Sequence, residues 1–210
     1  MDIGKICYRW YQFFLNKIQR FNGVPALLMR LYLAPVMLQA GWNKFNSFQD
    51  TVAWFGDPDW GLGLPFPSLM ALLAISAELV GGVLLLVGLF TRLVTVPLMV
   101  TMVVAIFSVH WPNGWLAIAD PSSWLADGTI ILNQAVVEAP EKLAAAKALL
   151  QEHGNYEWLT SSGRFVILNN GIEFAATYFV MLLTLFFTGG GRYFSVDFWL
   201  KRFLSMDQAK

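Results

Sequence analysis

The chain has little charge, little histidine and almost no cysteine. Only 13% of its 210 residues are charged and 57% are hydrophobic, whereas an average soluble domain has roughly 25% charged residues. With a single cysteine, Cys7, the chain can form neither an intramolecular disulfide nor a CxxC motif. Its two histidines are too far apart in sequence to match the spacing of a metal-binding motif. Fourteen basic and fourteen acidic residues balance, which argues against a nucleic-acid partner. The scarcity of charge indicates a membrane protein instead.

Long apolar segments are what the chain has in abundance. Four of them are long enough to cross a bilayer core of about 30 Å at the helical rise: 24–45, 66–90, 92–110 and 168–188. We therefore predict an all-α fold, a four-transmembrane-helix bundle, forming a single membrane domain over residues 1–210. A helix at 1–22 and a segment at 192–204 mix basic with aromatic side chains, so we predict that both lie in the membrane interface.

The distribution of basic residues predicts the orientation of the spans. With the N-terminus in the cytoplasm, nine Lys and Arg residues lie on the cytoplasmic side and three on the other side. This asymmetry favours a multi-pass protein with both termini in the cytoplasm. Residues 111–167 then form a long loop on the outer side. Within that loop we predict a helix at about 140–153, with Pro140 near its first turn and Gly154 past its end.

Ionisable side chains inside the spans are the candidate functional residues. Glu78 lies at the midpoint of 66–90, where a charge costs on the order of 3 kcal/mol on insertion scales, so it must face protein or trapped water. At 1.5 Å per residue, Glu78 lies ~18 Å from the cytoplasmic edge and Lys44 ~30 Å. The predicted ligand-binding and proton-transfer residues are Glu78, Glu173, His110, Lys44, Gln39 and Arg30. All of them except Arg30 are expected in one layer in the outer half of the bundle. No catalytic residue and no metal site is predicted.

Each of these residues also has a structural interpretation. Buried acid–base pairs can fix the register of helices without further function, and Lys44 at the end of a span can anchor it in the interface. His110 can cap its helix or titrate. Arg30 can reach toward Glu78 or extend to the cytoplasmic surface. The sequence leaves these alternatives open.

Three segments resemble a known family. The first segment, which begins at Arg30, is RLYLAPVMLQAGWNKF, with Ala40, Gly41, Lys44 and Phe45 at its end. The second segment contains Glu78, the glycines and Thr91–Arg92, in the sequence AELVGGVLLLVGLFTRL. The third segment is the predicted helix that ends at His110. Together they cover about residues 24–114 and resemble the DoxX family of small bacterial integral membrane proteins. The long loop departs from the shortest family members and suggests a subgroup with an added periplasmic element, linked to copper- or oxidative-stress-related peptide maturation.

The resemblance implies a four-helix bundle in the bacterial inner membrane, often associated with redox proteins. Our leading hypothesis is a membrane subunit of a redox-linked complex that binds a quinone-like or other amphipathic small ligand between its helices. Because no haem, flavin or cluster motif is visible, electrons would come from a protein partner, and the chain would be an auxiliary subunit of a quinone-linked oxidoreductase. The expected partners are the lipid bilayer and a second protein or a second copy of this chain.

Two other functions stay open. The chain could be a non-catalytic scaffold or maturation partner whose 111–167 loop recruits a periplasmic peptide or protein. It could also be a small transporter, although four spans without a visible inverted repeat would need a dimer to complete one.

Overall fold

The computed structural model describes residues 3–207, and this part of the chain is α-helical with no strand. Two isolated β-bridges, Ile118 with Leu168 and Asp127 with Leu132, are the extended pairings that it contains. The chain divides into two compact units. The first unit runs up to Thr101 and resumes at Tyr178, and the second unit is Met102–Thr177. The predicted all-α class is confirmed.

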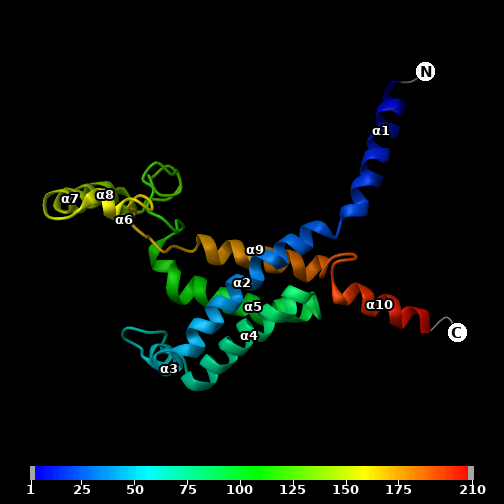
Figure 1. The fold of residues 1–210 in the computed structure, drawn as a ribbon, viewed down its shortest axis with the longest axis horizontal. Helices are drawn as coiled ribbons and strands as arrows, with labels where there is room; N and C mark the ends of the chain where they lie inside the picture. Colours follow the sequence, from blue (N-terminus) through cyan, green and yellow to red (C-terminus); the bar gives the residue numbers. More distant parts are fainter. Residues whose placement is uncertain (1–2, 208–210) are drawn as a thin grey trace. The chain divides into compact units, whose positions relative to one another are not determined.

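The first unit holds the long apolar helices. Its elements, drawn in Figure 1, are α1 (Ile3–Ile18), η1 (Gln19–Phe21), α2 (Val24–Asn46), α3 (Phe48–Gly56), α4 (Pro67–Val87), most of α5 (Thr91–Val104), the C-terminal part of α9 (Glu173–Thr188) and α10 (Val196–Asp207). The second unit holds η2 (Ala105–His110), η3 (Trp111–Asn113), α6 (Gln134–Val137), α7 (Ala139–His153) and α8 (Tyr156–Leu159).

Three helical segments among the described residues are long and apolar enough to cross a membrane: Cys7–Asn46, Pro67–Val87 and Thr91–Asn113. α9 is apolar but has only 16 residues. At 1.5 Å per residue it rises about 24 Å, short of a bilayer core of about 30 Å. Residues 168–172, which we expected to start this span, are not helical. The molecule is therefore a membrane protein, and a fourth complete span stays a prediction.

The centre of the first unit is the packing of α2 against α4, which lie alongside each other in Figure 1. Leu33, Ala34 and Met37 of α2 are buried there. Glycines make the approach possible, because a Cβ at Gly41 would lie 2.9 Å from Leu79 Cγ and one at Gly82 would lie 2.7 Å from Leu38 Cγ. Small residues at such contacts let helix backbones approach closely in membranes.

The turn between α4 and α5 is held by a residue from the C-terminal segment. Gly88, at φ +70°, ends α4 in the left-handed conformation that glycine adopts most easily. α5 begins three residues later, at Thr91. The carboxylate of Asp197 accepts hydrogen bonds from the backbone N–H groups of Phe90 at 2.7 Å and Thr91 at 2.9 Å. It thereby caps the start of α5.

The second unit is organised by asparagine side chains and a small apolar cluster. Leu116, Ala126 and Val136 form that cluster. The carbonyl oxygen of Asn113 accepts hydrogen bonds from the side-chain amides of Asn133 at 2.9 Å and Asn169 at 2.7 Å. These bonds satisfy loop backbone that no strand or helix pairs.

Candidate functional site

An ion pair between α2 and α4 is the strongest candidate site in the first unit. Glu78, in the middle of α4, is 3% exposed. Lys44, in the last turn of α2, donates hydrogen bonds from Nζ to Oε1 and Oε2 of Glu78, both at 2.8 Å. The side chain of Lys44 is 28% exposed and that of Glu78 is 4% exposed. The pair is thus sealed on the side of the carboxylate and open on the side of the ammonium.

The local sequence explains why the two charges meet. Gly41 lies one turn before Lys44 on α2, and a Cβ there would lie 3.0 Å from Glu78 Cβ, so the glycine lets the glutamate approach the α2 backbone. The Thr51 hydroxyl of α3 donates to the Lys44 carbonyl oxygen at 3.3 Å. An unpaired carboxylate in an apolar span is strongly unfavourable, so the lysine compensates a charge that the fold buries.

Arg30 does not take part in this pair. It is 1% exposed and donates hydrogen bonds to four carbonyl oxygens, those of Leu85, Leu86, Gly190 and Phe194. Two of these carbonyls belong to the last turn of α4, where the helix dipole presents its negative end. The structure therefore places the guanidinium neither against Glu78 nor at the surface, the two arrangements that we considered from the sequence.

Gln39 faces away from the pair. Its side chain is exposed and donates to Oδ1 of Asn43, one turn further along α2, at 2.8 Å. Contacts of this kind between residues i and i+4 stabilise a helix modestly. We predicted that Gln39 takes part in a ligand site. That stays a prediction, because the hydrogen bond of Gln39 is to Asn43 rather than to Glu78.

His110 and Glu173 lie in the second unit, where both bind backbone. His110 Nδ1 is 2.9 Å from the carbonyl oxygen of Asn170, a residue in the left-handed conformation at φ 59°. Glu173 Oε2 accepts a hydrogen bond from the backbone N–H of Ala117 at 2.9 Å. The backbone N–H of Glu173 donates to the Trp115 carbonyl oxygen at 2.9 Å. Both residues fix residues 110–117 to residues 169–173.

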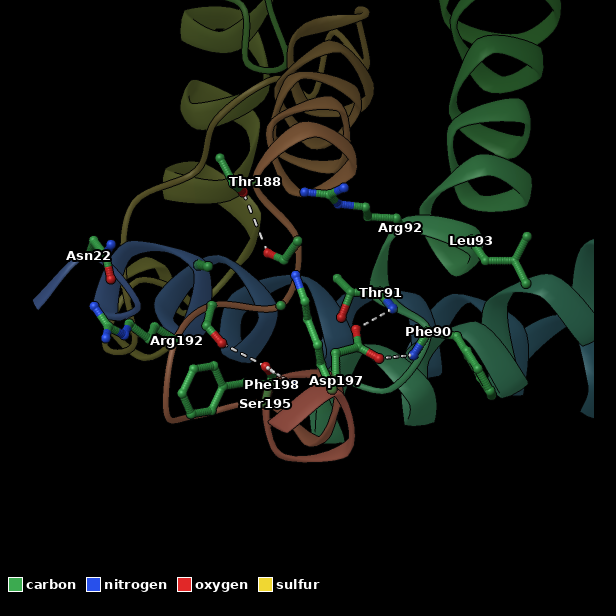
Figure 2. A pocket seen from close by; sticks show the side chains of 15 residues that line it. Asn22, Phe90, Thr91, Arg92, Leu93, Thr188, Arg192, Ser195, Asp197 and Phe198 are labelled. Carbon is green, nitrogen blue, oxygen red and sulfur yellow. Dashed lines mark hydrogen bonds between the residues drawn. The ribbon is translucent and has the colours of Figure 1, made fainter. Parts of the chain in front are cut away.

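Sequence reasoning missed a group of residues at the other end of the first unit. The carbonyl oxygen of Gly190 accepts a hydrogen bond from Arg30, and Asp197 binds the backbone N–H of Thr91 at the start of α5. All three residues, Thr91, Gly190 and Asp197, line a cavity shown in Figure 2. The available signals were the three consecutive glycines at 189–191 and a lone acid, Asp197, among basic and aromatic residues. Among residues 3–207 no group of three or more His, Cys, Asp and Glu side chains is placed to hold a metal ion.

Comparison with known proteins identifies part of the chain. Residues 26–111 match the model of the DoxX family. The chain is also 36% identical over 86 residues to "Putative oxidoreductase CatD" of Bacillus subtilis (strain 168). That match covers 41% of this chain and 60% of CatD, so the chain spans less than two thirds of that relative. No solved structure matches. The family match includes the Lys44–Glu78 pair and His110, and it ends before Glu173.

Proposed function

Because residues 26–111 match the model of the DoxX family, we propose that this chain is a DoxX-type membrane protein, and that it is the membrane subunit of a redox-linked complex that binds a quinone-like ligand at the Lys44–Glu78 pair. The observation that carries the proposal is the pair itself, a buried carboxylate whose lysine partner stays partly exposed. CatD, which shares 36% identity, has a name that describes an oxidoreductase, and this supports a redox setting.

The hydrogen-bonding capacity of the pair suits an oxygen-bearing ligand. A lysine ammonium has three N–H donors, and Glu78 takes two hydrogen bonds from Lys44. One donor direction is left on a side chain that is 28% exposed. The third N–H of Lys44 can donate a hydrogen bond to a carbonyl or hydroxyl oxygen of a quinone-like molecule. Glu78 accepts hydrogen bonds from the same ammonium and can accept a proton from it. A quinone would supply two-electron, two-proton chemistry, and the electrons would come from a protein partner.

The proposal includes the placement of the chain in the cell. We place it in the bacterial inner membrane as a multi-pass protein, with both termini cytoplasmic because basic residues are concentrated on that side. Association with a second protein, or with another copy of this chain, belongs to the same proposal. We propose that Arg30 and Gln39 support the helices that carry the pair, and that Glu173 and His110 act within the second unit.

The experiment is a quinone titration of the purified full chain in lipid nanodiscs. Decylubiquinone is added, and binding is followed by quenching of the fluorescence of the nine tryptophans. Glu78→Gln and Lys44→Met are each expected to raise the apparent Kd at least tenfold. Glu138→Gln changes an exposed acid in the second unit that also pairs with a lysine, Lys142, and should leave the Kd unchanged. If Glu78→Gln binds decylubiquinone as the wild type does, the proposal is wrong.

A second candidate function rests on the surface of the second unit. Large apolar side chains are exposed there, among them Trp124 at 69%, Trp158 at 71% and Leu168 at 68%. Such side chains favour a contact with a peptide, a protein or the membrane interface. If this unit recruits a periplasmic partner, replacing residues 133–155 by a Gly-Ser linker should abolish cross-linking to that partner, and Glu78→Gln should leave it intact. The opposite pattern would favour the redox proposal.

A further inference from the structure

A cavity of about 830 Å³ in the first unit is separate from the Lys44–Glu78 pair. It is bounded by the start of α5, the glycine-rich segment after α9 and the first turns of α10 (Figure 2). Three basic side chains line it, Arg92, Arg192 and Lys201, with one acid, Asp197. The lining therefore carries an excess of positive charge.

The one acid in the lining is already engaged. Both carboxylate oxygens of Asp197 accept backbone hydrogen bonds, from Phe90 and Thr91, at the start of α5. The same carboxylate is near enough to Arg30 to attract the buried guanidinium electrostatically. Asp197 thus offsets the partial positive charge of a helix N-terminus and the charge of a buried arginine. The one carboxylate in the lining is therefore already occupied by these contacts.

The contacts of those basic side chains agree with this. Arg92 Nη2 donates to the Phe187 carbonyl oxygen at 3.0 Å. The guanidinium of Arg192 lies 5.0 Å from the centre of the Tyr193 ring. Among the residues that the structure describes, none of Arg92, Arg192 and Lys201 makes an ion pair with a carboxylate. Their charges are available to an anion from outside the chain.

A buried hydroxyl in the lining gives a second, independent indication. Thr91 is 0% exposed, and its Oγ1 has no hydrogen-bond partner within residues 3–207. Buried hydroxyl groups in proteins are nearly always hydrogen-bonded, because an unsatisfied one destabilises the fold. Since Thr91 lines the cavity, a ligand oxygen there can accept its hydrogen.

Exposed apolar side chains also line the cavity. Leu93, in the first turn of a helix long and apolar enough to cross a membrane, is 71% exposed, and Phe90, directly before that helix, is 54% exposed. Basic side chains beside exposed apolar ones suit a molecule with an anionic head and an apolar tail. We propose that this cavity binds the phosphate group of an anionic phospholipid, with Arg92, Arg192 and Lys201 as the cations and Thr91 as a hydroxyl donor.

Phosphate chemistry alone would also admit a free phosphate ion, so the test has three ligands. The full chain is purified in a neutral detergent, and its unfolding midpoint is measured against added phosphatidylglycerol, phosphatidylcholine or inorganic phosphate. Because a ligand stabilises the state that it binds, we expect phosphatidylglycerol to raise the midpoint by several degrees and phosphatidylcholine to leave it unchanged. If inorganic phosphate raised the unfolding midpoint as much as phosphatidylglycerol does, the site would bind a soluble anion and the lipid proposal would be wrong. Equal responses to both lipids without a response to phosphate would overturn the proposal.

A pair of matched variants separates a built site from general charge attraction. Arg192→Gln/Lys201→Gln is expected to raise the apparent Kd for phosphatidylglycerol at least tenfold. The control, Arg164→Gln/Lys147→Gln, removes one arginine and one lysine from the second unit and should change the Kd less than twofold. Equal losses in both variants would overturn the site, because they would show that only net charge matters.

Thr91→Val keeps the shape of the side chain and removes the unpaired hydroxyl. In lipid-free detergent the variant should unfold at the same temperature as the wild type or higher, since no hydrogen bond is lost. Its Kd for phosphatidylglycerol should nevertheless rise several-fold. A variant that folds normally and binds phosphatidylglycerol as tightly as the wild type would show that the hydroxyl does not face the ligand.

Discussion

Replacing Arg30 should destabilise the first unit more than any other single loss of charge. The guanidinium is 1% exposed and joins three parts of the chain that are far apart in sequence: α2, the last turn of α4 and the segment between α9 and α10. Arg30→Met removes all of its donors while keeping an apolar side chain of similar length. The carbonyl oxygens that it served would lose their partners inside an apolar unit.

The magnitude follows from those four acceptors. A buried acceptor left without a partner costs about 1–3 kcal/mol. The Leu85 carbonyl oxygen keeps the backbone N–H of Gly88 at 3.1 Å, so three acceptors lose their described partner. Allowing for partial relaxation, we expect Arg30→Met to lower the free energy of unfolding by about 3–5 kcal/mol. Arg30→Lys keeps the charge, but lysine lacks the planar fork of donors, so we expect a loss of about 2–3 kcal/mol.

The assay is reversible unfolding of the full chain by sodium dodecyl sulfate titrated into neutral detergent micelles, followed by circular dichroism. Arg164→Met is the control, because Arg164 is exposed in the second unit and surface substitutions usually change stability by less than about 0.5 kcal/mol. If Arg30→Met is as stable as the control variant, the four hydrogen bonds do not hold the unit together and the reasoning is wrong.

Two further predictions concern packing and pH. Gly41→Val should lower the free energy of unfolding by about 1–3 kcal/mol, because its Cβ would lie 2.9 Å from Leu79 Cγ; unchanged unfolding in the same detergent titration would contradict the close approach of α2 and α4. The backbone N–H groups of Trp60 and Asp59 hold the pKa of the Asp57 carboxyl below its usual range. These bonds stabilise the carboxylate, so their contribution is present above the unfolded pKa and is lost as pH falls through the lower folded pKa. A ¹³C NMR titration of Asp57 should therefore give a midpoint below that of an unperturbed aspartate, and a midpoint at or above the unperturbed one would contradict the turn.

The helical class and the resemblance to the DoxX family over residues 26–111 were both accessible from the sequence, because they depend on composition and on local segments. Apolar runs of span length are recognisable without any tertiary information, and the segments around Lys44 and Glu78 carry the resemblance that the family comparison confirms for residues 26–111. α9 shows the limit of this reasoning. Hydropathy marked 168–188 as a span, but the helix begins only at Glu173, whose side chain and backbone bind the loop at 115–117.

The pairing inside the membrane was harder to predict. Heights along the helices put Lys44 ~12 Å above Glu78. The structure nevertheless joins them at 2.8 Å, because a height per residue ignores the reach of a lysine side chain and the tilt of a helix. Arg30 was undecidable for another reason. Its acceptors lie at least 55 positions away, and backbone carbonyls carry no signature in the sequence. The sequence shows which residues are charged, but only the packed structure shows which backbone groups form hydrogen bonds with them.

The most direct test of a ligand site at the Lys44–Glu78 pair is mass spectrometry of the lipid-soluble molecules that co-purify with the full chain. The wild type, Glu78→Gln and the control Glu138→Gln are extracted from the same membranes in the same mild detergent, and quinone is quantified per mole of protein. We predict near-stoichiometric quinone with the wild type and the control, and a loss of at least tenfold with Glu78→Gln. Equal quinone content in all three preparations, or none in any, would contradict the account and leave the pair as a structural contact between α2 and α4.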